Sequence, residues 1–498
     1  MLVYNNDELE RAKRNELQKW IRNQVYVQVP DNGQPRIHTR WVCTNNTSVF
    51  TGKLEVKTRL VAKGFQDVEA GNVRSDSPTC SKEGFIITMG VVKSHGWMCK
   101  SMDIETAFLQ GKKMNRPVYL HPPPEANVPD GYIWKLQKCV YGLSDASRMW
   151  YLTVREELMK LGAVPSKHDQ AIYSWYFNGR LHGIITTHVD DFFFAGSKIF
   201  HTNVMDKVRK VFKVKCEHSA DFRYIGLNVK MVNDKIRIGQ DEYVKNLSPI
   251  PLSNDRDLQD KISKEEVTKV RQLVGQLNWL ATQTRHDLSY DISDMSSMIK
   301  LENVDCIKQA NKTLKKAKKE KSQISVPDLG ILENVKLVVY SDASHANLID
   351  GGSQGGYVIF LQGKNGNYLP VSWQSKRVKR VVKSTLAAET LAMVDAAEAA
   401  VYYRKFILEI LGMDDSIKNV PIVCCTDNSS LYDAAHSSTQ IEDKRLRIEI
   451  AILREMLNKR EITRFAWVES GKQVADSLTK KGVPSFRILG YFSEPKES

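Results

Sequence analysis

The stretch Gly-Ile-Ile-Thr-Thr-His-Val-Asp-Asp-Phe-Phe-Phe-Ala-Gly, residues 183–196, sets two adjacent acids between two apolar, β-favouring runs. Such runs predict two buried strands that join at Asp190 and Asp191. An Asp-Asp pair is most often a solvated turn, but tight surface turns favour Asn-Gly or Asp-Gly and lack flanks of this kind. Burying charge is costly without a partner, and adjacent carboxylates suit Mg²⁺. The stretch therefore predicts a metal-binding pair of strands.

A further strand-borne acid and a second acidic set extend this interpretation. Asp103 lies upstream and opens the run Asp-Ile-Glu-Thr-Ala-Phe-Leu-Gln-Gly, residues 103–111. Four more acids lie far downstream, at Asp342, Glu389, Asp427 and Asp476. Each acid alone is weak evidence, because exposed acids are usually only solvated. Two Mg²⁺ ions about 3.5–4 Å apart hold both the attacking and the leaving oxygen in phosphoryl transfer, so the two sets predict nucleic-acid chemistry at two centres.

Composition agrees with this prediction. A chain of 498 residues with 42% hydrophobic and 26% charged residues predicts a globular protein of two to four domains rather than a disordered or membrane one. Its net charge of +14 favours a polyanionic partner such as an RNA or DNA duplex. The 8 cysteines show no Cys-x-x-Cys spacing, which indicates reduced core thiols in an intracellular compartment. No apolar stretch is long enough to cross a membrane, and the polar first residues do not have the pattern expected of a signal peptide.

Local patterns divide the first half of the chain. A helix is expected over about 7–23 and a strand over 24–29. Residues 40–43 and 57–65 follow, with basic residues interleaved with apolar ones in a strand-like pattern. Taken alone, this pattern is best interpreted as an amphipathic strand with a solvated basic face. Ser144 or Asp145 is expected to cap a helix that runs to Leu161.

The second half alternates helices and strands. Helices are expected over about 203–212 and 264–284, with a hairpin near 233–234. Residues 308–321 hold seven lysines in a helical pattern, which is either a solvated helix face or a phosphate-tracking surface. Residues 327–330 are predicted to link to a last α/β unit at about 336–481, with three strands, a long helix at 384–411, a strand, helices and a last strand before Asp476.

The ordered motifs resemble those of one family. The first half resembles the reverse transcriptase of copia-type LTR retrotransposons at Arg40-Trp41-Val42, residues 59–65, residues 103–111, Tyr141-Gly142-Leu143 and Val189-Asp190-Asp191. Residues 271–275 and 284–287 are similar to its connection region. Residues 341–343, 384–389, 426–428 and 474–480 are similar to its ribonuclease H.

The resemblance implies an α+β and α/β multidomain fold, a right-hand polymerase with fingers, palm and thumb followed by a connection and a ribonuclease H-like domain. The expected bounds are 1–250 for fingers and palm, 251–330 for thumb and connection with the basic helix, 331–482 for the ribonuclease H-like domain and 483–498 for a C-terminal tail. The implied location is a cytoplasmic particle or the nucleus.

The resemblance also implies residue roles. Asp103, Asp190 and Asp191 would hold two Mg²⁺ ions in the palm, and Asp342, Glu389, Asp427 and Asp476 would hold two more in the ribonuclease H site. Arg59, assisted by Lys57, would bind the incoming triphosphate, and Phe108 would exclude a ribose 2′-hydroxyl. The implied partners are an RNA template, a DNA primer, dNTPs and an RNA–DNA hybrid, the RNA strand being recognised by its 2′-hydroxyl and shape.

The sequence departs from the family pattern at three places. His188 stands where Tyr is usual, Ser144-Asp145-Ala146-Ser147 replaces Lys-Gln-Ala-Pro, and no histidine closely precedes Asp476, although Glu469 does. No protease, zinc-knuckle or integrase motif is present, so the chain is expected to be the C-terminal end of a longer Pol polyprotein. The alternative is a decayed or domesticated copy that binds nucleic acid without catalysis.

Overall fold

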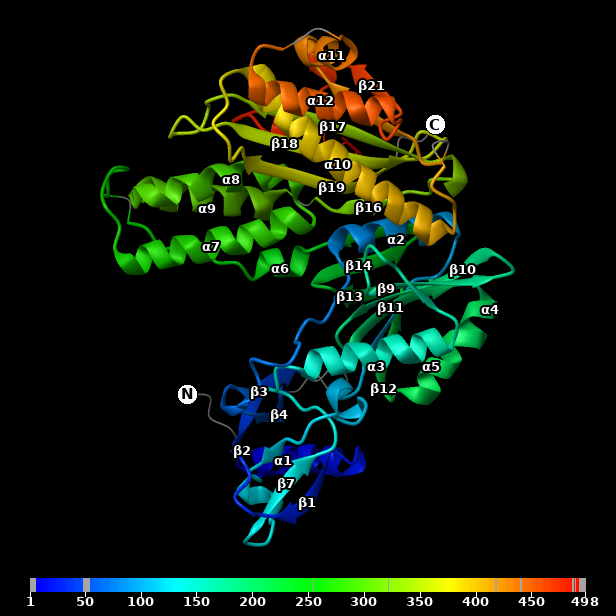
Figure 1. Ribbon diagram of the computed structural model, residues 1–498. Coiled ribbons are helices and arrows are strands. Elements are labelled where there is room, and N and C mark those ends of the chain that lie inside the picture. The colour runs from blue at the N-terminus through cyan, green and yellow to red at the C-terminus, as the bar shows by residue number, and fades with distance from the viewer. Residues whose placement is uncertain are drawn as a thin grey trace.

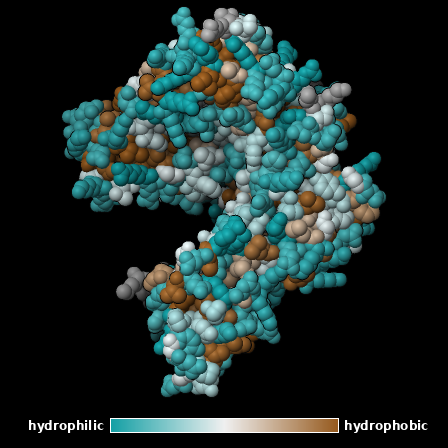
Figure 2. Space-filling view, in the orientation of Figure 1, coloured by the Kyte–Doolittle hydropathy of each residue, from teal (hydrophilic) through white to brown (hydrophobic). Residues whose placement is uncertain are grey.

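The computed structural model describes residues 6–47, 54–253, 255–320, 322–416, 419–438, 441–485, 488 and 490–491. They form a curved body in which an N-terminal unit, a central sheet, a helical unit and a C-terminal sheet follow one another (Figure 1). One side of this body is hollowed between the helical unit and the N-terminal unit, and hydrophilic residues dominate the surface around the hollow (Figure 2).

The N-terminal unit packs one helix on small sheets. Its elements are α1 (Asn6–Arg22), β1 (Tyr26–Pro30), β2 (Arg36–Ile37), β3 (Thr39–Thr47), β4 (Leu54–Ala62), β6 (Tyr119–Leu120) and β7 (Tyr132–Leu136). The strand order is β1-β7-β6-β2, and β3 and β4 form a separate hairpin. The helix predicted at 7–23 is confirmed, and it buries Leu17 and Trp20, whose ring lies 5.7 Å from that of Trp134.

Two glycines let the hairpin approach the rest of this unit. A Cβ on Gly64 would lie 2.0 Å from the carbonyl oxygen of Gly142, and one on Gly142 would lie 2.0 Å from that of Ala62. Gly142 also has a φ of +96°, which L side chains rarely adopt. The end of β4 is thus fixed against the Tyr141-Gly142 loop.

The central sheet has the order β12-β5-β11-β10-β9-β8. Its strands are β5 (Lys100–Ile104), β8 (Val164–Pro165), β9 (Ile172–Phe177), β10 (Arg180–His188), β11 (Asp191–Gly196) and β12 (Val214–Ser219). Side chains alternate across it, as a strand requires. Phe193 faces the core of helix α2 (Lys82–Ser94), whereas Phe192 and Phe194 face the core of α3 (Ala146–Lys160) and the helices α4 (Lys198–Phe200) and α5 (Asp206–Val211). This alternation explains the Phe-Phe-Phe run.

A four-stranded sheet and a helical unit come next. The sheet joins β13 (Asp221–Tyr224), β14 (Leu227–Val232), β15 (Lys235–Gly239) and β16 (Ile324–Val326) in that order. The helices are α6 (Asp241–Lys245), α7 (Lys264–Gln283), α8 (Ser289–Met298) and α9 (Val304–Lys319), and they share one apolar core. Ser263 and Glu266 form a capping box at the start of α7. The expected helix at 264–284 is confirmed.

The C-terminal sheet has the order β19-β18-β17-β20-β21, antiparallel among the first three strands and parallel in the last two pairs. Its elements are β17 (Lys336–Ser344), β18 (Gln354–Gln362), β19 (Tyr368–Arg377), α10 (Thr385–Leu411), β20 (Ile422–Thr426), α11 (Ser429–His436), α12 (Lys444–Asn458) and β21 (Arg464–Trp467). The predicted order of strands and helices is confirmed, and Asp476 lies in a short 3-10 helix, Val474–Leu478.

Residues 327–330 connect β16 to the segment before β17, and they are held in place, because β16 pairs with β15, Leu329 is fully buried and its N–H donates to Ser94 Oγ at 3.0 Å. The predicted cap of α3 holds only in position. Asp145 is the N-cap residue, but its side chain makes no capping hydrogen bond. Its carboxylate instead pairs with Arg116, which also binds Asp67, so the acid ties the start of α3 to the loop after β4. A single apolar core runs from α2 through β16 into the C-terminal sheet.

Candidate active sites

The first candidate site lies at the end of the central sheet. Antiparallel pairing of β5 with β11 sets Asp103 directly opposite Asp191. Directly paired residues have their Cβ atoms about 4.5–5.5 Å apart. Like charges at that distance repel, and burial together with Asp190 and Asp103 raises the pKa of Asp191 to about 6. A site that keeps these carboxylates ionised despite their mutual repulsion needs a cation.

Asp190 sits in the tight turn between β10 and β11. His188 pairs with Asp191 across the turn, so Val189 and Asp190 are its two central residues. Val189 has a φ of 56°, which is rare for a β-branched residue. The indole Nε1 of Trp150 donates to the carbonyl oxygen of Val189 at 2.7 Å and so holds the turn against α3.

Two lysines lie near Asp103. Lys215 on β12 forms an ion pair with Asp103, and this partner raises the pKa of Lys215 against the effect of burial. Burial lowers the pKa of Lys57, with Arg59 and Lys215 adding to the effect and Asp103 opposing it. The predicted Lys57 is therefore near Asp103, the predicted Arg59 is near Lys57, and Lys215 is an additional cation.

The Tyr141 ring lies near both Arg59 and Phe108, the residue predicted to exclude a ribose 2′-hydroxyl. The guanidinium carbon of Arg59 lies 5.6 Å from the centre of the Tyr141 ring, a cation–π distance. The centre of the Phe108 ring lies 5.1 Å from that of the same tyrosine ring. Burial raises the pKa of Tyr141 to about 12, so this phenol stays neutral. Arg59 and Phe108 therefore both lie against Tyr141, and the charge of Asp190 also acts on this phenol.

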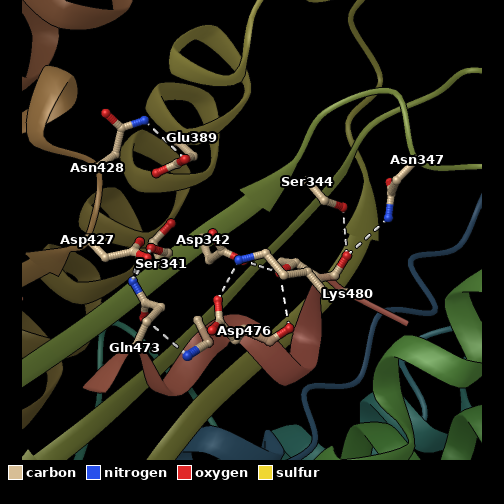
Figure 3. Close-up of polar contacts among 12 residues, drawn as sticks. Ser341, Asp342, Ser344, Asn347, Glu389, Asp427, Asn428, Gln473, Asp476 and Lys480 are labelled. Carbon is tan, nitrogen blue, oxygen red and sulfur yellow. Dashed lines mark hydrogen bonds and ion pairs between the residues drawn. The ribbon is translucent and has the colours of Figure 1, made fainter. Parts of the chain in front are cut away.

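The second candidate site lies on the C-terminal sheet (Figure 3). Asp342 is on β17, Glu389 on the first turns of α10, and Asp427 directly follows β20. One carboxylate oxygen from each of the three lies within 4.8 Å of the others. Of the two acidic sets, only this one brings three carboxylates so close in the described part of the chain. Asp476 lies outside the group of three.

Burial controls the charge at this site. It raises the pKa of Glu389 to about 7, against a hydrogen bond from Asn428 Nδ2 at 3.0 Å, and it also raises the pKa of Asp342, which is 2% exposed. The other carboxylate oxygen of Glu389, Oε2, is buried without a hydrogen-bond partner. Gln473 Nε2 donates to Asp427 at 3.3 Å and to the Ser341 carbonyl at 3.1 Å, which orients Asp427.

A lysine bridges Asp476 and Asp342. Lys480 Nζ lies 2.6 Å from Asp476 Oδ1 and 3.3 Å from Asp342 Oδ2. Thr479 donates its hydroxyl to the same oxygen of Asp342. The four carboxylates, one of which has a buried, unpartnered oxygen, suit hard divalent cations. The ammonium group of Lys480 neutralises part of their charge.

Comparison with known proteins agrees with this geometry. Residues 23–254, which include Asp103, Asp190, Asp191 and the residues around them, match the family of reverse transcriptases (RNA-dependent DNA polymerases). The chain is 26% identical over 500 residues to the Retrovirus-related Pol polyprotein from transposon RE2 of Arabidopsis thaliana, covering 95% of this chain and 33% of that protein. It is 21% identical over 485 residues to the Transposon Ty1-MR1 Gag-Pol polyprotein of Saccharomyces cerevisiae, covering 89% of this chain and 26% of that protein.

Residues 23–254 thus match the reverse transcriptase family, and the chain is similar to copia/Ty1-type retrotransposon Pol polyproteins. The resemblance seen in the sequence motifs is confirmed. The chain spans about one third of the length of the RE2 polyprotein.

Solved structures extend the likeness in fold. The foamy viral protease-reverse transcriptase in complex with RNA/DNA hybrid matches 94% of this chain and 54% of its own, with a TM-score of 0.52 and 12% identity. The related structure in complex with ds DNA matches 94% of this chain and 71% of its own, with a TM-score of 0.53 and 12% identity. The mixed α/β fold of a reverse transcriptase thus extends over both candidate sites. None of the helices described combines the length and the apolar character that crossing a bilayer requires.

The sequence motifs do not include several residues that the structure places at the two candidate sites. Lys215 has no signal in the sequence, since its pairing with Asp103 depends on the register of β12. Tyr141 stands out only as part of a motif. At the C-terminal site, Asn428 follows Asp427, and Gln473 and Lys480 flank Asp476 at three and four residues, so spacing of one helical turn is the available signal.

Proposed function

We propose that this protein is an RNA-directed DNA polymerase whose C-terminal unit is a ribonuclease H. The observation that carries the polymerase assignment is the pairing of Asp103 with Asp191 on adjacent strands, with Asp190 in the turn beside them. The match of residues 23–254 to the reverse transcriptase family supports it. In this proposal the fingers and palm comprise about 1–250, the thumb and connection 251–330 and the ribonuclease H 331–482, before the tail 483–498.

The residues around the palm acids have distinct tasks. Arg59 presents a planar, permanently charged fork to the triphosphate, and its contact with the Tyr141 ring orients the fork. Lys57 adds a second cation at the same place. Phe108, packed against Tyr141, blocks the space of a ribose 2′-hydroxyl and so selects dNTPs. Lys215 neutralises Asp103 before substrate arrives.

The observation that supports a nuclease is the close group of Asp342, Glu389 and Asp427. In the proposed reaction, water attacks a phosphodiester of the RNA strand in an RNA–DNA hybrid. Asn428 and Gln473 hold Glu389 and Asp427 in place, and Asp476 completes the set of four acids. The hollow between the N-terminal and helical units, lined mainly by hydrophilic residues, is proposed to hold the template and primer (Figure 2).

Both sites fit Mg²⁺, two ions in each. The buried, unpartnered Oε2 of Glu389 and the raised pKa of Asp191 are features of sites whose anions lack a counter-charge. Asp103, Asp190 and Asp191 would hold the ions of the palm, and Asp342, Glu389, Asp427 and Asp476 those of the nuclease. When bound, such ions supply Lewis-acid neutralisation of the charge that develops on phosphate oxygens.

Primer extension tests the polymerase proposal. The purified protein is expected to extend a DNA primer on an RNA template when MgCl₂ is present and to stop when EDTA is added. A separate assay follows cleavage of the RNA strand in a labelled hybrid. The competing proposal, a decayed copy that only binds nucleic acid, predicts hybrid binding without either activity. The presence of all seven acids supports the enzyme, because drift would be expected to remove some of them.

A further inference from the structure

Lys480 forms ion pairs with two of the four acids of the C-terminal site. Its ammonium group bridges Asp476, at 2.6 Å, and Asp342, at 3.3 Å. Asp342 belongs both to this pair and to the close group with Glu389 and Asp427. The four acids therefore form two half-sites that share Asp342 (Figure 3). One half-site has an unpartnered buried oxygen, and the other is already neutralised by a cation.

The fold sets this lysine in place. The carbonyl oxygen of the preceding residue, Thr479, accepts hydrogen bonds from Ser344 Oγ at 2.7 Å and from Asn347 Nδ2 at 3.3 Å. The Thr479 hydroxyl binds Asp342 directly. Lys480 thus begins from a fixed backbone one residue from the site, and its ammonium group is aimed at the acids rather than at solvent.

Lys480 also has space for a second side-chain position. Its side chain is 40% exposed, and it borders an open pocket of about 420 Å³ between the helical unit and the segment 477–485. Asp291, Lys316 and Glu320 also line that pocket, and Asp291 already pairs with Lys316 at 3.0 Å. An ammonium group that left Asp342 and Asp476 would find water and the carboxylate of Glu320 there.

We propose that Lys480 is a resident cation of the nuclease site, and that a second divalent ion binds between Asp342 and Asp476 only when Lys480 swings out into the neighbouring pocket. This inference rests on the proposed nuclease function and specifies its regulation. An ammonium group and a divalent ion cannot share the same two carboxylate oxygens without strong repulsion. The first ion, at Asp342, Glu389 and Asp427, should therefore bind well before the second.

Counting bound Mn²⁺ tests the proposal without measuring activity. The full-length protein carries Asp190→Asn and Asp191→Asn to weaken the palm site, and free Mn²⁺ is followed by electron paramagnetic resonance. The expected result is one tightly bound ion and a second, weaker one. Lys480→Met should tighten the second ion by about tenfold or more, because the competing cation is gone. Lys480→Arg, which keeps the charge, should leave the second ion weak.

Lys481→Met is the matched control. The Lys481 side chain is 71% exposed, and its ammonium group lies 3.7 Å from Asp294. Lys481→Met therefore removes one positive charge, as Lys480→Met does, but not the charge that pairs with Asp342 and Asp476. Equal tightening in the Lys480→Met and Lys481→Met proteins would reduce the effect to net charge and overturn the proposal. No tightening in either protein, or a weaker second ion in Lys480→Met, would overturn it as well. Circular dichroism checks the fold, and Lys480→Gln replaces the methionine variant if that protein does not fold.

Two acid variants separate this inference from the function on which it rests. Asp476→Asn should weaken only the second ion, whereas Asp427→Asn should weaken the first. If Asp427→Asn leaves Mn²⁺ binding unchanged, the metal centre of the proposed nuclease is wrong. If Asp427→Asn loses the first ion while Lys480→Met behaves like its parent, the nuclease proposal stands and only the role of Lys480 fails.

Discussion

Trp150 donates its indole N–H to the carbonyl oxygen of Val189, with 2.7 Å between the nitrogen and the oxygen. Val189 has a positive φ, and a backbone of this kind costs on the order of 1–3 kcal/mol and persists only where its surroundings enforce it. The bond joins a buried helix residue to the turn that carries Asp190. Helix α3 thereby contributes to the geometry of an acid that it does not itself contain.

Replacing Trp150 with Phe should lower the rate of primer extension by about tenfold, because small misplacements of a catalytic group are costly. The apolar bulk is largely kept, so the fold should survive. Steady-state extension on a short primed RNA template measures kcat. Trp175→Phe is the matched control, since its indole binds the Leu161 carbonyl at 3.1 Å, away from the acids. Equal losses in both variants would assign the effect to general destabilisation.

The two activities should separate cleanly by mutation. Asp190→Asn removes an anionic oxygen from the palm and is expected to abolish DNA synthesis while hybrid cleavage continues. Asp427→Asn is expected to lower hybrid cleavage by orders of magnitude while extension on a short template continues, leaving the product as a hybrid. Both activities are measured on each protein. Normal extension by Asp190→Asn would refute the palm assignment, and parental cleavage by Asp427→Asn the nuclease assignment.

A smaller side chain at position 108 should change the selectivity between dNTPs and NTPs. Phe108→Val removes the ring that contacts Tyr141 and opens space beside it, so ribonucleotides should be incorporated far better than by the parent. The reason is that the ring excludes the 2′-hydroxyl by collision rather than by a hydrogen bond. The ratio of kcat/KM for dNTP and NTP measures the effect. An unchanged ratio would mean that another residue guards the sugar.

The stability of the metal-free protein should depend on pH through Glu389. Burial raises the pKa of its carboxyl to about 7 from 4.5, so between these values the folded state binds more protons than the unfolded state. Rising pH then lowers the free energy of unfolding. Relative to Glu389→Gln, the parent should lose up to about 3 kcal/mol between pH 5 and pH 8 in EDTA, as followed by urea unfolding. A constant difference between the two proteins would contradict the burial of an ionisable Glu389.

Binding of an RNA–DNA hybrid should weaken steeply with salt, because neutralised phosphates release their counterions. Helix α9 exposes Lys308, Lys312, Lys315, Lys318 and Lys319, whereas Lys316 is held by Asp291 at 3.0 Å. Changing Lys312, Lys315 and Lys319 to Gln should reduce the slope of log K against log salt by about one unit for each phosphate that the helix no longer neutralises. The control changes Lys198, Lys207 and Lys210, which are exposed on α4 and α5. Equal slopes in all three proteins would make the α9 lysines a solvated face.

Local patterns predict elements such as α1, α7 and α10, because these depend on periodicity along the chain, whereas the buried helix α2 and the helix α8 are not among the predicted elements. The predicted start of the long helix α10 lies within one residue of its observed start, and the acids stand out because charge inside an apolar strand is visible in the sequence. Pairings across the fold are not visible in this way. Lys215 meets Asp103 through sheet register, and Asp145 meets Arg116 across 29 residues. Sequence spacing carries no information on such pairings.

Helix α2 shows what the continuous core implies for any attempt to divide the protein. Residues 84–92 are buried all around, partly under β19 of the C-terminal sheet, where a Cβ on Gly90 would lie 2.6 Å from a methyl carbon of Leu369. A chain cut after residue 330 would leave that face of α2 bare, and a bare apolar face of this kind promotes aggregation. The proposed polymerase and the proposed nuclease therefore share one apolar core, and each covers apolar surface of the other.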